Sequence, residues 1–162
     1  SRSLTRRAFG ASVSSKFPEG TVAGLYKRAV AQNPLIDSVR FHEQRLNWTL
    51  KEFDRYSSAF AFGLIESGYQ RGDKLLLWAD QTNSAELLVA QMGAIKAGVA
   101  VVAFKEKESL DALNETLKSS GARGMLFSPS TEIEAEKGAT RETFLKKLMP
   151  DLQKLYPGDP LQ

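Results

Sequence analysis

Few residues of this chain have the types and spacing that chemistry requires. His42 is the only histidine in 162 residues and cysteine is absent, so neither a zinc-protease motif nor a His/Cys metal site can form. No Gly-x-Ser-x-Gly sequence occurs, which removes the nucleophile elbow of the hydrolases. Glu106 and Glu108 lie in a charged stretch, KEKES, that is typical of a solvated loop. We therefore predict no catalytic residue, no metal site and no cofactor.

A phosphate-binding loop needs several small, flexible residues in succession, because only then can backbone N–H groups converge on the anion. Gly121 and Gly124 are separated only by Ala-Arg, and neither common glycine-rich phosphate motif is present. One polar segment, ADQTNSAE at residues 79–86, follows an apolar run, where α/β sheets often bind ligands. A retained small-molecule site at this segment stays open as an alternative.

Charge is distributed unevenly along the chain. Residues 1–18 contain Arg2, Arg6, Arg7 and Lys16 and no acid, whereas the rest has 18 basic and 19 acidic residues. A nucleic-acid partner is not expected, because such proteins gather basic residues on a folded surface. A transmembrane helix is not expected either, because no apolar run approaches the roughly 20 residues that one needs.

The first 20 residues form a basic arm rich in Arg and Ser, which is the composition of a mitochondrial targeting segment. A solvated basic tail is the alternative. We predict a mitochondrial location, on the matrix side or associated with the inner membrane. Arg2, Arg6 and Arg7 could pair with carboxylates or lipid phosphates, and Phe9 could add an apolar anchor. These four residues are the predicted contacts with another protein subunit or with anionic lipid head groups.

Alternating strands and helices must position any site in the rest of the chain. Three apolar runs predict buried strands of a parallel sheet: KLLLWA at 74–79, VAVVAF at 99–104 and GMLFS at 124–128. Helical periodicity lies between them, from residue 83 or 84 to Gly98 and from Leu110 to Gly121. This alternation predicts a three-layer α/β fold with a right-handed parallel sheet.

Residues 21–73 add two helices and a hairpin to this sheet. A helix is expected from 21 to 32, a small hairpin from DSVRFH and RLNW, and a longer helix to about residue 67. Thr49 and Glu52 have the spacing of a capping box at the start of that longer helix. Phe62 and Ile65 widen its apolar stripe, which predicts contacts on two sides.

Core residues and domain limits follow from these elements. Four side chains are predicted to be buried in the core: Phe60, Leu76, Leu88 and Val101. Residues 21–128 should form the α/β domain. Residues 129–162 should form a loop, short helices divided near Pro150, and a tail.

From about residue 21 to 127 these pieces occur in an order that resembles the first part of the adenylate-forming superfamily, the AMP-binding enzymes. The matching stretches are TVAGLYKRAVAQNP, RLNWTLKEFDRYSSAFAFGLIESGYQRGDKLLLWADQTNSAELLVAQMGAIKAGVAVVAF and LNETLKSSGARGMLF. The superfamily includes acyl-CoA synthetases, luciferases and the adenylation domains of peptide synthetases. The resemblance implies the fold of the opening part of such an enzyme and, for the family, ATP-dependent activation of carboxylic acids.

The family's phosphate loop, its nucleotide-contacting motifs and its catalytic lysine have no counterpart in these residues, so none of its catalytic residues can be placed here. Together with the arm, this absence leads us to expect a non-catalytic accessory subunit of a large mitochondrial assembly. An inner-membrane complex such as ATP synthase or a respiratory complex is the predicted setting. A fragment or chain of a working acyl-CoA synthetase is the alternative, and a regulatory binder of acyl or nucleotide ligands is a third.

Overall fold

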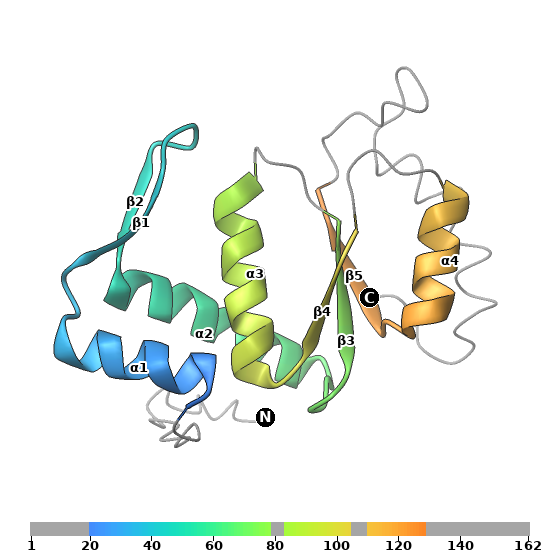
Figure 1. Ribbon diagram of the computed structural model, residues 1–162, viewed down its shortest axis with the longest axis horizontal. Coiled ribbons are helices and arrows are strands. Elements are labelled where there is room, and N and C mark those ends of the chain that lie inside the picture. Colours follow the sequence, from blue (N-terminus) through green and yellow to red (C-terminus); the bar gives the residue numbers. More distant parts are fainter. Residues whose placement is uncertain (1–19, 79–82, 105–109, 129–162) are drawn as a thin grey trace, which may run out of the picture.

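The computed structural model describes residues 20–78, 83–104 and 110–128. The elements are α1 (Val22–Gln32), β1 (Asp37–Phe41), β2 (Leu46–Thr49), α2 (Leu50–Glu66), β3 (Lys74–Trp78), α3 (Ser84–Ala97), β4 (Ala100–Ala103), α4 (Leu110–Ser120) and β5 (Gly124–Phe127). Figure 1 shows α1, α2 and the β1–β2 hairpin at one end of the molecule and the remaining strands, with α4, at the other. The predicted helices between residues 129 and 162 lie outside the described residues.

A three-stranded parallel sheet organises the domain. Its order is β4-β3-β5, so the middle strand is the first of the three in sequence. Side chains alternate across β3: Leu75 and Leu77 join a core cluster with residues of α2 and α3, whereas Leu76 and Trp78 join a second cluster with residues of α4. The sheet therefore lies between α3 and α4 (Figure 1), which confirms the predicted three-layer α/β fold.

Local sequence signals set the main helix boundaries. The Thr49 hydroxyl accepts a hydrogen bond from the Glu52 backbone N–H, and the Glu52 carboxylate accepts one from the Thr49 backbone N–H, so the predicted capping box is confirmed. Gly98 ends α3 at a φ of 75°, in the left-handed region that glycine adopts without strain. The hairpin is antiparallel, with Phe41 paired to Leu46 across the turn.

The predicted core is partly confirmed. Leu76 is fully buried, and Phe60 and Val101 are half-buried and pack against the α2–α3 side of the sheet. Leu88 is half-buried as well, but Leu87 and Ala90 are the residues of the same helix that contribute to that cluster, so its predicted place in the core is not confirmed.

The second apolar side predicted for α2 is not covered within the described residues. Phe62 is 47% exposed and Ile65 is 54% exposed. The side of α2 that is buried carries Phe53, Ser57, Ala61 and Leu64. A helix period identifies apolar positions but does not show which of them another element will cover.

Candidate functional site

Lys96 is the one charged residue of α3 after its first turn, and its side chain is almost completely buried, with 5% of its area exposed. Its Nζ donates to two oxygens of Asp54, the backbone carbonyl at 3.1 Å and Oδ1 at 2.7 Å. It also lies 2.7 Å from the Ser57 hydroxyl and 3.0 Å from the Ser58 hydroxyl. All of these acceptors belong to α2, so the ammonium group joins two helices that cover one face of the sheet.

The surroundings of Lys96 extend to α1. The Tyr26 ring centroid lies 5.6 Å from Nζ, and the Tyr26 hydroxyl donates to the Leu50 carbonyl at 2.8 Å. Burial lowers the pKa of Lys96, the Asp54 carboxylate opposes that shift, and the Lys27 charge adds to it. Burial also raises the pKa of Tyr26, an effect that the Ser38 hydrogen bond opposes and the Asp54 charge reinforces. We call Lys96, Asp54, Ser57 and Ser58 the Lys96 brace.

The Lys96 brace is suited to holding helices together and not to covalent chemistry. A lysine nucleophile must be deprotonated and must reach its substrate. Here the ammonium group already has several oxygen acceptors and only 5% of the side chain is exposed. Gly93, one turn before Lys96, lets α3 lie close to α2 because glycine has no Cβ. A Cβ at this position would lie 2.8 Å from the Ser57 carbonyl oxygen.

The carboxyl ends of the parallel strands form the second candidate position, since α/β sheets bind ligands there. The Asn83 side-chain amide donates to the Ser128 hydroxyl at 2.8 Å and so connects the start of α3 with the end of β5. The start of α3 is not an open anion site. The Gln44 side-chain oxygen accepts from the Ala85 backbone N–H at 2.9 Å and from the Ser84 hydroxyl at 3.1 Å.

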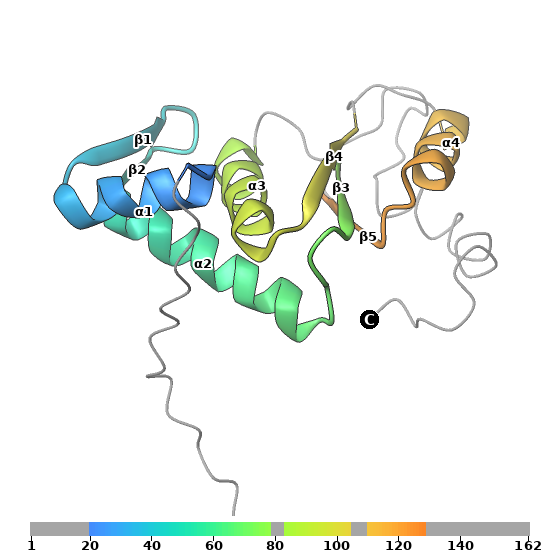
Figure 2. The same cartoon turned by 60° about the horizontal axis from the view of Figure 1, so that its bottom comes forward.

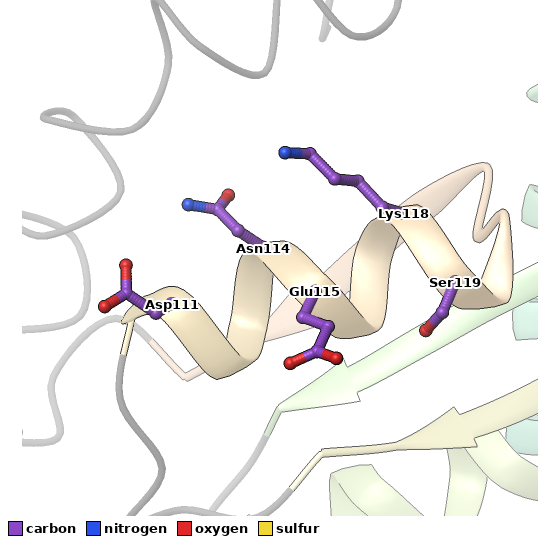
Figure 3. Close-up of a pocket in the computed structure, with 5 residues that line it drawn as sticks. All are labelled: Asp111, Asn114, Glu115, Lys118 and Ser119. Carbon is purple, nitrogen blue, oxygen red and sulfur yellow. The ribbon is translucent and has the colours of Figure 1, made fainter.

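A shallow depression lies on the outer side of α4. Figure 3 shows that its lining side chains all project from this one helix and spread apart along it: Asp111, Asn114, Glu115, Lys118 and Ser119. A ligand site requires polar groups that converge from several directions. The depression therefore offers no arrangement for catalysis.

Within the described residues no group of three or more His, Asp or Glu side chains could hold a metal ion. His42 is exposed in the turn between β1 and β2. In the same part of the chain, no helix combines the length and the apolar character needed to cross a membrane.

The predicted partner contacts Arg2, Arg6, Arg7 and Phe9 lie outside the described residues, so they remain predictions. Of the polar segment 79–86, the structure describes only residues 83–86.

The sequence analysis did not predict the Lys96 brace or the contact from Gln44. A signal was available for Lys96, which is the lone charge between residues 87 and 98. No comparable signal exists for Gln44, because its partners are about 40 residues away.

Taken together, the middle strand of the parallel sheet, the tightly joined α2 and α3 and the attached hairpin define an α/β domain. The AMP-binding enzyme family model matches residues 26–160, and the chain belongs to this family.

Two of the curated relatives are an acyl-CoA synthetase and an acyl-CoA ligase by name. It is 25% identical over 138 residues to YngI of Bacillus subtilis (strain 168), which carries a provisional acyl-CoA synthetase name; the match covers 85% of this chain and 24% of YngI. It is 24% identical over 131 residues to the mitochondrial medium-chain acyl-CoA ligase ACSF2 of Bos taurus, covering 80% of this chain and 20% of that protein. The chain thus spans between a fifth and a quarter of the length of these relatives.

Solved structures show the same fold. The N-terminal subdomain of Klebsiella oxytoca NpsA, in complex with 3-hydroxyanthranilyl-AMSN, matches with a TM-score of 0.62 and 21% identity, over 74% of this chain and 29% of that one. A fatty acyl CoA synthetase of Mycobacterium tuberculosis matches with a TM-score of 0.62 and 18% identity, over 66% of this chain and 21% of that one. The predicted resemblance to the first part of an AMP-binding enzyme is confirmed.

These findings contradict the expectation of a non-catalytic accessory subunit, in ATP synthase or elsewhere. The family and the relatives are enzymes, and the matches support the alternative, a section of an acyl-CoA synthetase or adenylation enzyme. The error came from treating a missing phosphate loop as evidence against activity. A section that spans 24% of its relative need not contain that loop.

Proposed function

We propose that this chain is a section of an enzyme that activates carboxylic acids with ATP, of the acyl-CoA synthetase type. The observation that carries the proposal is the AMP-binding enzyme match over residues 26–160, with relatives named for acyl-CoA synthesis. In this reaction a carboxylate oxygen attacks the α-phosphorus of ATP and pyrophosphate leaves. A thiol then attacks the acyl carbonyl carbon, and AMP leaves.

Residues 20–128 would supply scaffold for this chemistry. The Lys96 brace fixes α2 against α3, and the Asn83–Ser128 contact fixes the start of α3 at the carboxyl edge of the sheet. The relatives are about four to five times as long as the matched section, so the groups that hold ATP and the acid would come from outside the described residues.

Exposed apolar side chains support a place within a larger enzyme. Val22 and Leu25 on α1, Phe62 and Ile65 on α2, and Ile95 on α3 are each between 43% and 56% exposed. Figures 1 and 2 both show α1 and α2 side by side, with the end of α3 next to them. Burying such side chains is worth about 25 cal/mol per Å² of apolar area, so further chain packed here would be stabilised.

The test is to tag the protein at its native locus, recover it from its own cells, and measure its intact mass and its exchange of labelled pyrophosphate into ATP. We expect a chain several times longer than this one and exchange that depends on an added fatty or aromatic acid and on Mg²⁺. Material from untagged cells is the control. A native protein of only 162 residues that gives no acid-dependent exchange across such a panel of acids would refute the proposal.

A mitochondrial location is proposed with this function. It is supported by the acid-free, Arg-rich residues 1–18 and by the mitochondrial name of the bovine relative. Residues 1–20 fused to a fluorescent protein should direct it to mitochondria, and replacing Arg2, Arg6 and Arg7 by Gln should leave it in the cytosol. Mitochondrial signal from the Gln-substituted fusion, or none from the unsubstituted one, would contradict this.

A further inference from the structure

Among the described residues, the side chain that directly precedes helix α3 does not cap it. Asn83 precedes the helix, yet its ψ of 36° is not the extended conformation of a capping residue, and its side chain makes no capping hydrogen bond. The Asn83 amide instead donates to the Ser128 hydroxyl at the end of β5. Ala85 is 1% exposed, so water has little access to its backbone N–H, and a buried donor of this kind needs a partner from the protein.

The turn of the β1–β2 hairpin supplies that partner. Gln44, in this turn, accepts from the Ala85 backbone N–H at 2.9 Å and from the Ser84 hydroxyl at 3.1 Å. The Gln44 amide group also donates to the Glu86 carboxylate at 2.7 Å. Figures 1 and 2 both place the hairpin turn beside the first turn of α3.

The Gln44 side chain therefore accepts the hydrogen bond of a buried backbone N–H of α3 and donates one to Glu86, the acidic residue in the first turn of that helix. That acidic residue, Glu86, is placed favourably with respect to the helix dipole. The arrangement assigns the two side chains different tasks, since Gln44 caps α3 from the hairpin while Asn83 reaches across to β5.

We propose that the β1–β2 hairpin is an external capping device for α3, and that Gln44 is the positioning residue which allows Asn83 to join α3 to Ser128. With the hairpin turn seated, Asn83 bridges to β5 at the carboxyl edge of the sheet. With the turn displaced, Asn83 moves to the extended conformation, caps α3 itself and releases Ser128. The position of the hairpin thus sets the geometry of the edge where parallel α/β sheets bind ligands.

Residue-level hydrogen exchange and NMR on the 162-residue protein test this device without any assay of activity. Gln44→Ala should accelerate exchange of the Ala85 amide by less than the roughly fivefold that the loss of one ordinary hydrogen bond gives, because Asn83 then replaces part of the lost bond. It should also shift the side-chain amide resonances of Asn83. Glu43→Ala, at the neighbouring exposed turn residue, is the matched control and should change neither signal.

The decisive comparison is a double-mutant cycle. Asn83→Ala alone should leave exchange at Ala85 unchanged, because Gln44 still caps the helix. In the Gln44→Ala background the same substitution should accelerate exchange at Ala85 further, because the substitute cap is then lost too. Equal effects of Asn83→Ala in both backgrounds would overturn the proposal, as would a Gln44→Ala protein that behaves like Glu43→Ala.

Circular dichroism confirms that each variant is folded. If Gln44→Ala loses the hairpin, Gln44→Met takes its place in the same cycle. Methionine keeps the length of the side chain and removes both polar atoms, so the same two outcomes apply.

Discussion

The two faces of the parallel sheet are covered in different ways. On one face α2 and α3 approach so closely that a Cβ at Gly93 would lie 2.8 Å from both the Ser57 carbonyl oxygen and a ring carbon of Phe60. The Lys96 brace crosses the same contact. On the other face α4 packs through large side chains, with Leu113 fully buried and the Trp78 and Phe104 rings edge to face at 5.6 Å.

This difference implies opposite sensitivities. At Gly93 the α2–α3 face has no room for an added atom, because backbone of α2 lies directly opposite. The α4 face depends on the volume of its side chains and should suffer most when atoms are removed. Four predictions test this contrast, from the largest expected effect to the smallest.

Removing volume from the α4 face should have the largest effect. Leu113→Ala should lower the free energy of unfolding by about 3 kcal/mol, because it removes buried methyl groups and leaves a cavity. Leu35→Ala, at a site that is 78% exposed, makes the same chemical change and should cost less than about 0.5 kcal/mol. Denaturant titration measures both, and equal costs would show that α4 does not depend on Leu113.

Adding one carbon to the α2–α3 face should cost nearly as much. Gly93→Ala should lower the free energy of unfolding by about 2 kcal/mol, because the new Cβ meets the carbonyl oxygen of Ser57. Gly63→Ala is the matched control in α2, where nothing lies within 4 Å of the new carbon. It should stabilise the protein by up to about 1 kcal/mol, since alanine favours helix. A neutral Gly93→Ala would contradict the close approach of the two helices.

Removing the ammonium group should separate charge from packing within the Lys96 brace. Lys96→Ala should cost about 2 kcal/mol, below the usual cost of breaking a buried pair because 35% of the Asp54 side chain is exposed and can be hydrated. Lys96→Met keeps most of the packing and should cost less than half as much. Lys118→Ala, an exposed lysine of α4, is the control. Equal losses for Ala and Met, measured by thermal and denaturant unfolding, would assign the effect to charge alone.

The smallest effect should appear in alkaline solution. Lys96 has a lowered pKa when folded, so between that pKa and the ordinary value of 10.5 the unfolded chain binds more protons, and the free energy of unfolding rises with pH. Tyr26 has a raised pKa, so above 10.0 the folded chain binds more protons and stability falls. The measurement is the free energy of unfolding as a function of pH, by denaturant titration. Compared with the wild type, Lys96→Met should lack the rise in this free energy, and Tyr26→Phe should lack the fall. A profile unchanged in Lys96→Met would show that Lys96 titrates as in water.

Elements that depend on near neighbours could be predicted from the sequence. The capping box of Thr49 and Glu52, the glycine ends of helices and the apolar strand at 74–79 are set within a few residues, and each was confirmed with small changes of boundary. The place of Leu88 in the core was not confirmed, and the second side of α2, at Phe62 and Ile65, is exposed where it was predicted to be covered. The reason is that burial depends on which element arrives opposite each position.

The functional prediction failed for a different reason. The ordered match to the family was visible in the sequence, and the comparisons confirmed it. The conclusion of a non-enzyme rested on absent motifs, and absence within a section that covers 24% of a relative says nothing about the remainder. The positive evidence in these residues was the better guide.

By itself, the sequence determined the kinds and order of the elements, the parallel α/β class and the family. The reason is that helical periodicity, helix caps and buried strands each depend on residues that are close together in the chain. Only the tertiary structure decided that Lys96 would be enclosed by α2, that Gln44 would cap a helix some 40 residues later and that β3 would lie in the middle of the sheet. Each of these depends on contacts between distant segments. Such contacts form only when burial on both faces of the sheet has fixed the helices in place.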